Sequence, residues 1–294
     1  MKLLAIFGPT AAGKTAVAIR VAAILRERGE DPVAVNCDSI QVYRGLEALS
    51  GAATADERRR LEHRLVSFVP VNEEFSAGRY AELAHAEVDR LLAEGRRPIV
   101  VGGTGLYLRA ALAELELRPR VPSEVRAEVE ADLAARGPLA MHADLDPDLA
   151  AGVHPNDRKR IARLTELQRA GIFPHASSQG LWTARMRRPA QLIGLTVDRA
   201  ELARRIDVRV DSILTAGAAD EARAADAAGA SRTARSAIGF EQLLAGDVEA
   251  MRRAQRAYAR RQLTWMRRMP GVQLVERAER GDDELATEIA VGLH

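Results

Sequence analysis

The chain has 294 residues, 47% of them hydrophobic and 29% charged, which suits a globular protein with one large domain or a core plus a smaller insert. No apolar run approaches the ~20 residues of a membrane span, and the apolar start is read as a buried strand, not a signal peptide. Cys37 is the only cysteine, which excludes an intrachain disulfide and favours a reducing, cytoplasmic setting. The net charge of +2 does not by itself indicate nucleic acid binding.

The first third of the chain alternates short apolar runs with helical patterns. Strands are expected at 3–7, 32–36, 65–69 and 98–101, and helices at 14–28 and 76–94. The strand segments are continuously apolar, which is typical of a parallel sheet covered on both faces. The fold class predicted is therefore α/β.

From about residue 114 the pattern becomes helical, rich in alanine and charge, and interrupted by prolines. We expect an all-helical insert at 115–188 between the two parts of a core, 1–114 and 189–294. The second part of the core should contain strands at 191–197 and 272–275, a helix at the end of the chain, and helices at 199–216, 218–228 and 247–268.

The strongest motif is a phosphate-binding loop between the first strand and the first helix. It consists of eight consecutive residues: Gly8, Pro9, Thr10, Ala11, Ala12, Gly13, Lys14 and Thr15. The loop amides and the helix N-terminus would present partial positive charge to a di- or triphosphate such as ATP. Lys14 can reach a terminal phosphate, and the Thr15 hydroxyl can ligate Mg²⁺.

Two further motifs follow strands. Asp38, Ser39, Ile40 and Gln41 come after the second strand, and the glycine-rich segment 102–105, which contains Thr104, follows the strand at 98–101. Carboxyl ends of parallel strands line the ligand crevice, so Asp38 is expected to face the phosphate loop as a base or metal-shell group. Asp38 could instead only cap a helix, and the glycines could only form a tight turn.

Two basic segments are candidates for nucleic acid contact. His154-Pro155-Asn156-Asp157 precedes a basic run at 158–163, and seven arginines lie with two aromatic residues at 252–268. Such segments suit phosphate backbones and base stacking. The alternatives are helix capping by Asn156 or Asp157, a solvated charge run, and aromatic residues that belong to the core.

Together these motifs resemble the tRNA dimethylallyltransferase family. They occur in the family's order: the phosphate loop, Asp-Ser-x-Gln-Val-Tyr at 38–43, Gly-Gly-Thr-Gly-Leu-Tyr at 102–107, His-Pro-Asn-Asp at 154–157, and Arg-x-Tyr-Ala-Arg-Arg-Gln-x-Thr-Trp at 256–265. The resemblance implies a P-loop NTPase-like core, a helical insert that contacts the tRNA anticodon arm, dimethylallyl diphosphate as donor, and Mg²⁺ held at Thr15. The reaction implied is prenylation of N6 of adenosine 37 in tRNAs that read codons beginning with U, with release of diphosphate.

The resemblance also implies roles for residues. Asp38 would take the N6 proton, Lys14 and Arg209 would bind the diphosphate, and Thr104 would act with them and hold the base. The expected tRNA contacts are Asp38, Ser39, Ile40, Gln41, Thr104, Arg126, Lys159, Arg160, Ile161, Ala162 and Arg163. Gly239-Phe240-Glu241 departs from the family's Gly-Tyr pattern, which leaves a tRNA contact there in doubt.

Other functions share parts of this pattern. A small-molecule or nucleotide kinase would explain Lys14 and Asp38 but not the basic segments. A prenyltransferase acting on free adenylate would not need an extensive insert, and an RNA-binding protein without activity would not need Lys14, Thr15 and Asp38 together. A monomer without membrane attachment is expected.

Overall fold

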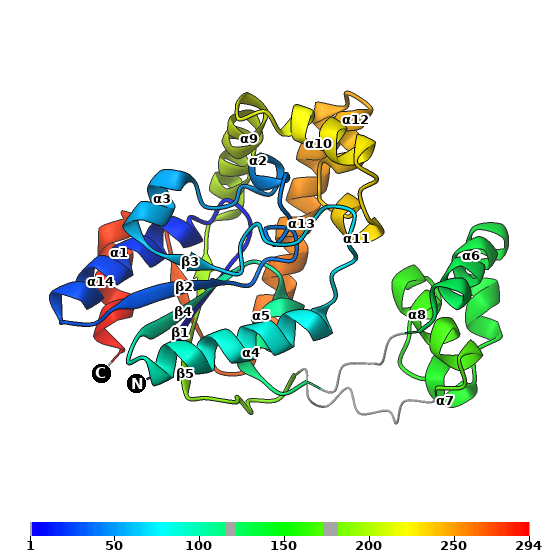
Figure 1. Ribbon diagram of the computed structural model, residues 1–294, viewed down its shortest axis with the longest axis horizontal. Coiled ribbons are helices and arrows are strands. Elements are labelled where there is room, and N and C mark those ends of the chain that lie inside the picture. The colour runs from blue at the N-terminus through cyan, green and yellow to red at the C-terminus, as the bar shows by residue number, and fades with distance from the viewer. Residues whose placement is uncertain (1, 116–120, 173–181, 294) are drawn as a thin grey trace. The chain divides into compact units, whose positions relative to one another are not determined.

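A computed structural model describes residues 2–115, 121–172 and 182–293 (Figure 1). The chain forms two compact units, one of Met1–Leu115 with Leu181–His294 and the other of Glu116–Gly180. The insert expected at 115–188 thus ends earlier, because residues 182–188 belong to the first unit. None of the helices in the described part of the chain is both long and apolar enough to span a membrane.

The first unit contains a six-stranded sheet in the order β3-β2-β4-β1-β5-β6, and every strand pair is parallel. The strands are β1 (Leu3–Phe7), β2 (Pro32–Asn36), β3 (His63–Arg64), β4 (Arg97–Gly102), β5 (Ala190–Thr196) and β6 (Val272–Glu276). The α/β class and the parallel sheet are confirmed. Buried, uninterrupted apolar residues in β1, β2 and β4 match helices on both faces of the sheet.

The strand expected at 65–69 is wrong. The third strand is shorter and earlier, His63–Arg64, and pairs with Ala34 and Val35. Leu65 and Ser67 have φ angles of 59° and 53°, a left-handed conformation that is incompatible with a regular strand. The segment is a loop that donates hydrogen bonds to the carbonyls of Gln41 and Val42.

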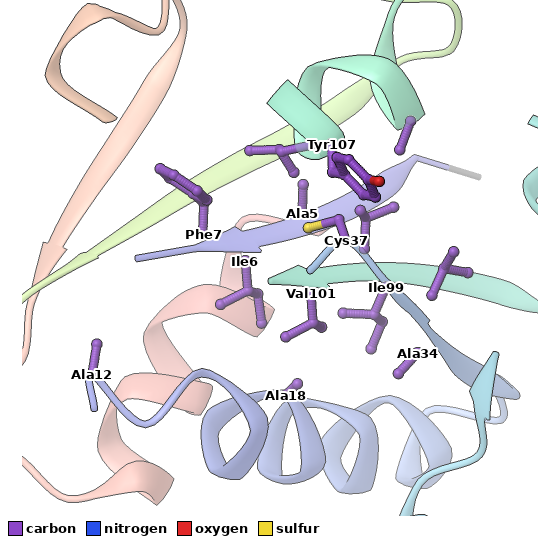
Figure 2. Packing of buried hydrophobic residues seen from close by; sticks show 14 of the residues in the cluster. Ala5, Ile6, Phe7, Ala12, Ala18, Ala34, Cys37, Ile99, Val101 and Tyr107 are labelled. Atoms are coloured by element: carbon purple, nitrogen blue, oxygen red, sulfur yellow. The ribbon is translucent and has the colours of Figure 1, made fainter. Parts of the chain in front are cut away.

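Helices cover both faces of the sheet. On one face α1 (Lys14–Glu27) packs against α14 (Asp282–Val291), and on the other α4 (Ala77–Ala93) packs against α5 (Gly105–Leu112). Figure 2 shows Ala18 of α1 facing Ile6 and Val101, whereas Ala5 points to the opposite face, toward Tyr107 of α5. This alternation follows from the period-two direction of strand side chains.

Capping residues in the sequence set several helix starts. Ser76, Asp198 and Asp247 each accept a hydrogen bond from a first-turn amide of α4, α9 (Arg199–Thr215) and α13 (Val248–Arg268), respectively. The remaining helices of this unit are α2 (Glu47–Ser50), α3 (Ala55–Arg60), α10 (Ala218–Ala227), α11 (Arg232–Arg235) and α12 (Phe240–Leu244).

The second unit is helical in its described part, as expected. It contains α6 (Ser123–Ala143), which is kinked at Gly137, α7 (Pro147–Ala150) and α8 (Arg158–Arg169). Its small core consists of Val129, Leu133, Met141 and Ile161. Asp157 caps α8 by accepting a hydrogen bond from Arg160 N at 3.1 Å, so the capping interpretation of the Asn-Asp pair is correct for Asp157.

Candidate active site

Three of the sequence motifs meet at the carboxyl edge of the sheet. The phosphate loop follows β1, Asp38 follows β2, and Thr104 follows β4, and β2, β4 and β1 are neighbours in the sheet. The open edge of a parallel sheet is where ligands of such folds bind. The sheet order thus brings together residues that lie up to 96 positions apart (Gly8 to Thr104) in the chain.

The phosphate loop has the backbone geometry of an anion site. Gly13 has φ 82°, and α1 begins at Lys14 without a side-chain cap on its first amides. Those amides are available to a phosphate, and the positive end of the helix dipole points at them. Lys14 Nζ donates to the Pro9 carbonyl at 2.8 Å, so the ammonium folds back over the loop.

Two cations are gathered beside this loop. Burial, and after it the charge of Arg209, lowers the pKa of Lys14 to about 8, although the nearby Asp38 partly opposes both effects. Burial also lowers the pKa of Arg209, again opposed by Asp38. Because the two cations repel each other in a partly dehydrated place, an anion bound between them would be stabilised by both.

Arg209 is held in place by α2 and its C-terminal turn. Its Nη2 donates to the Ser50 carbonyl at 2.9 Å, and the guanidinium lies so close to Gly51 that a Cβ there would fall 2.1 Å from Nη2. Gln41 Nε2 donates to the Gly51 carbonyl at 3.1 Å, which ties the Asp38 segment to the same turn. Arg209 and Gln41 therefore meet at the same turn, at the end of α2.

Asp38 sits in a rigid turn. Its Oδ1 accepts from Ile40 N at 2.9 Å, and its own amide donates to Asn36 Oδ1 at 3.0 Å. Asp38 also acts electrostatically on Lys14 and Arg209, which places it on the phosphate-loop side of the crevice, as expected. One carboxylate oxygen is used by the turn, so the other is the one that can act on a substrate.

Thr104 is linked to the Asp38 segment by hydrogen bonds. Its hydroxyl accepts from Ser39 N at 3.2 Å and lies 3.3 Å from the hydroxyl of Tyr258. Burial raises the pKa of Tyr258, and the nearby charge of Asp38 raises it further, so Tyr258 stays a neutral phenol that can donate. Thr104 and Ser39 are thus neighbours, although 65 positions separate them.

Gln262 and Arg277 had no role predicted from the sequence, and Tyr258 was expected only as an aromatic residue for stacking or for the core. Tyr258 and Gln262 come from α13, and Gln262 bonds both to the phosphate loop and to Gly103. Both residues lie inside the conspicuous run at 256–265, so the motif was a signal that could have found them. Arg277 donates to the Ala12 carbonyl at 2.8 Å behind the loop and pairs with Asp282; no sequence pattern indicated it.

A cavity of about 290 Å³ adjoins the site. It is lined by apolar side chains and hydroxyl groups from the Asp38 segment, α4, α5 and α11: Ser39, Ile40, Phe75, Ser76, Ala77, Leu106, Tyr107, Thr233 and Ser236. This mixture suits a flat organic group with a few polar atoms better than it suits a phosphate.

The basic residues of the second unit fall into two groups. Lys159 and Arg160 are exposed in the first turn of α8, and Arg160 lies 3.5 Å from Asp157. Arg163 donates to Glu166 at 2.7 Å, and Arg126 lies 3.8 Å from the same carboxylate. Two of the four basic residues expected to contact tRNA thus share one carboxylate within the unit, and Arg160 has a looser, exposed ion pair with Asp157.

The tRNA contact expected for Ile161 is wrong for its side chain, whereas the one expected for Ala162 stays a prediction. Ile161 is fully buried in the core of the second unit, so its side chain has no surface to offer RNA. Ala162 is partly exposed and packs against the same core. Ile161 is buried because it lies on the inward face of α8, whereas Lys159 and Arg160 lie on the exposed face of the same helix.

The arginine-rich helix α13 is also partly structural. Arg256 donates to Asp207 at 2.5 and 2.7 Å, and Arg252 pairs with Asp207 and Asp211. These arginines fasten α13 to α9, a structural role that the sequence did not indicate. Arg268 does lie over the ring of Trp182, 4.5 Å from its centroid, and Trp182 in turn contacts Trp265.

The described residues contain no group of three or more His, Cys, Asp or Glu side chains that could hold a metal ion. A zinc or calcium cage made by these side chains is therefore absent from the part of the chain that is described. Mg²⁺ is commonly bound by only one or two protein groups together with substrate phosphates, and that requirement is compatible with Thr15 in the second position of α1.

Known proteins share both the sequence and the fold. The family model for IPP transferase matches residues 41–269. The tRNA dimethylallyltransferase of Anaeromyxobacter dehalogenans strain 2CP-C is 42% identical over 92% of this chain and 94% of its own length, and that of Thermobifida fusca is 39% identical over 92% and 88%.

Among solved structures, the tRNA isopentenylpyrophosphate transferase of Bacillus halodurans superposes with a TM-score of 0.72 at 31% identity, over 99% of this chain and 95% of that one. A eukaryotic dimethylallyltransferase acting on tRNA shares the fold, with a TM-score of 0.77 at 24% identity, over 99% and 77% of the two chains. On the family match and on relatives of about 40% identity, the chain belongs to the IPP transferase family.

Proposed function

We propose that this enzyme transfers a dimethylallyl group from dimethylallyl diphosphate to N6 of adenosine 37 of tRNAs that read codons beginning with U, releasing diphosphate. The observation that carries the proposal is the pair of mutually repelling cations, Lys14 and Arg209, beside an uncapped phosphate loop and across from Asp38. A diphosphate would relieve the repulsion, and Asp38 would be placed to accept a proton. Relatives named tRNA dimethylallyltransferase support the acceptor and the reaction.

The reaction breaks the bond between the allylic carbon and the diphosphate oxygen and forms a bond from that carbon to N6. Adenine N6 is a weak nucleophile, because its lone pair is delocalised into the ring. The residues of this site must therefore stabilise the departing diphosphate, and Lys14, Arg209 and the loop amides are arranged to do so.

Asp38 would accept the proton that N6 loses, through the carboxylate oxygen that the turn leaves available. Thr104, held by Ser39 and Tyr258, would orient the base at the same edge of the sheet. To reach this edge, the adenine must leave its stack in the anticodon loop, at a cost of a few kcal/mol.

Mg²⁺ is part of the proposal. The Thr15 hydroxyl and the diphosphate oxygens would hold it, and it would supply a Lewis acid that neutralises charge on the leaving group. A monomer acting in the cytoplasm, where tRNA is found, completes the proposal.

A single comparison tests the function. The protein is incubated with labelled dimethylallyl diphosphate and Mg²⁺ in three separate reactions. The acceptor is bulk tRNA in the first, AMP in the second and ATP in the third. Label in tRNA alone is the expected result, at N6 of a single adenosine. Label in AMP or ATP would favour a free-nucleotide prenyltransferase. Phosphoryl transfer from ATP without prenyl transfer would favour the kinase alternative.

A further inference from the structure

One buried side chain bridges the donor and acceptor sides of the crevice. Gln262 of α13 is only 4% exposed, and its Oε1 accepts from Thr10 N in the phosphate loop at 2.8 Å. Its Nε2 donates to the Gly103 carbonyl, also at 2.8 Å, in the turn that leads to Thr104. A single amide thus spans the two loops.

The partners fix the direction of this amide. Thr10 N–H can only donate and the Gly103 carbonyl can only accept, so a flipped amide would lose both bonds. The fit is also close, because a Cβ at Gly103 would lie 2.2 Å from Gln262 Nε2. A buried amide with both ends satisfied is rigid, and removing one partner would leave polar groups unpaired.

The same face of α13 holds the neighbouring group as well. Tyr258, one helical turn before Gln262, has its hydroxyl 3.3 Å from that of Thr104. Tyr258 and Gln262 therefore connect α13 to both halves of the Gly103-Thr104 turn, while Gln262 alone continues to the phosphate loop.

We propose that Gln262 is a positioning residue that sets the distance between the diphosphate and the attacking base. This inference rests on the proposed function, since it assigns the diphosphate to the phosphate loop and the base to the Thr104 side. In-line attack needs the reacting atoms about 3–3.5 Å apart, and a misplacement of ~1 Å can lower the rate about 100-fold. Loss of the bridge should therefore lower kcat more than it raises either KM.

The chain provides a matched control on the same helix. Gln255 lies two turns earlier on α13 and is 7% exposed, yet among the described residues its side chain has no hydrogen bond to the phosphate loop or to the 102–104 turn. Gln255→Met and Gln262→Met each remove a side-chain amide from a buried position on α13. Only Gln262→Met cuts the bridge.

The experiment measures kcat and both KM values for prenyl transfer to tRNA by wild type, Gln262→Met and Gln255→Met. We expect Gln262→Met to lower kcat about 10- to 100-fold with each KM within about threefold, and Gln255→Met to keep wild-type kcat. Equal losses in the two variants would overturn the positioning role.

Gln262→Glu gives a second, independent readout. A protonated Glu can accept a hydrogen bond from Thr10 N and donate one to the Gly103 carbonyl, as Gln does. An ionised Glu cannot donate, so its carboxylate oxygen would repel the Gly103 carbonyl oxygen. Burial raises the pKa of such a carboxyl, so the ratio of Gln262→Glu to wild-type kcat should rise at least about fivefold as pH falls from 9 to 6. A ratio of the two kcat values that does not change with pH would overturn the positioning role, even if Gln262→Met fails to fold.

A wild-type enzyme that prenylates no tRNA would instead contradict the proposed function.

Discussion

Asp38 has an observed role in its turn and a proposed role as general base, and a single substitution can separate the two. Its Oδ1 accepts from Ile40 N and so fixes the turn, whereas the base function needs a carboxylate. Asp38→Asn keeps an acceptor for Ile40 N but cannot take a proton at neutral pH. We expect Asp38→Asn to lower kcat at least about 100-fold, the usual contribution of a general base.

The controls for Asp38 are the binding steps. Retention of tRNA by Asp38→Asn in a filter assay should stay within about threefold of wild type, since the turn persists. Asp38→Ala removes the turn's acceptor too, and any additional loss of tRNA affinity in that variant measures the turn alone. An Asp38→Asn enzyme with a tenth of wild-type kcat at saturating substrates would show that another group takes the proton.

Lys14 predicts a pH dependence for diphosphate binding. Its pKa in the ligand-free fold is lowered from 10.5 to about 8, so the unfolded chain binds more protons between these values and stability rises with pH there. A bound diphosphate favours the protonated amine and reverses this effect. The affinity gained from Lys14 should therefore be fully present below about pH 7 and decline above pH 8.

The measurement is inorganic pyrophosphate binding to wild type and to Lys14→Met between pH 6.5 and 9.5. The ratio of the two Kd values cancels the ionisation of pyrophosphate itself. We expect this ratio to shrink by up to about tenfold per pH unit above the Lys14 pKa. A ratio that stays constant over the whole range would mean that the Lys14 charge does not act on the diphosphate.

At the scale of elements, α2 and α9 support each other through one glycine. Gly51 ends α2 with φ 59°, and Arg209 of α9 lies against it with Nη2 bonded to the Ser50 carbonyl. Gly51→Ala would place a Cβ 2.1 Å from Nη2, so the guanidinium must move. We expect pyrophosphate affinity to fall about tenfold or more, the usual value of a hydrogen bond to a charged group.

Gly95→Ala is the matched control for Gly51→Ala. Gly95 also has a positive φ, 73°, but a Cβ added there, just past the end of α4, would have nothing within 4 Å. Gly95→Ala should lose about 1 kcal/mol of stability from the left-handed conformation, and Gly51→Ala at least as much, since Arg209 must also move there. If Gly95→Ala weakened pyrophosphate binding as much as Gly51→Ala, backbone strain rather than Arg209 would be the cause.

The sequence was most informative where a pattern is local. The phosphate loop, the Asp38 turn and the helices α1, α4, α9 and α13 could be predicted, because their apolar periods, caps and glycines lie within one segment. The strand at 65–69 failed because an apolar run resembles a strand whether or not its backbone can pair.

The site was less predictable where it depends on long-range contacts. Gln262 reaches residues 252 and 159 positions away, and Arg277 reaches one 265 positions away. Their residue types carry no signal of those partners, since buried amides and guanidinium groups serve many structural purposes. The pairing of Arg252 and Arg256 with α9 was missed for the same reason: the acids lie more than forty positions away in the chain.

At the scale of the whole molecule, the two compact units suggest a division of labour. All candidate catalytic residues and the phosphate loop belong to the first unit, whereas Lys159 and Arg160 belong to the second. Within the second unit, Arg126 and Arg163 share Glu166, which leaves Lys159 and Arg160 as the stronger candidates for contact with RNA phosphates. Donor binding and RNA retention should then respond to different substitutions.

A salt titration tests this division. Neutralising both residues in Lys159→Gln/Arg160→Gln should weaken tRNA binding and reduce the slope of log affinity against log salt by roughly one to two units, since each phosphate contact contributes about 0.7 to 0.9. Prenyl transfer at saturating tRNA should keep the wild-type KM for the donor, because the donor residues lie in the first unit.

Arg136→Gln is the control for net charge. Arg136 is exposed in the same unit but lies 2.5 Å from Asp144, so its charge is paired more closely than that of Arg160, which lies 3.5 Å from Asp157. Arg136→Gln should change the slope of log affinity against log salt by much less than 1, although it removes a positive charge from the second unit.

A Lys159→Gln/Arg160→Gln variant with the wild-type slope would show that the first turn of α8 is only a solvated charged surface. Equal changes in the double variant and in Arg136→Gln would show a general effect of charge, and only a selective loss of slope in the double variant supports contact between α8 and the RNA backbone.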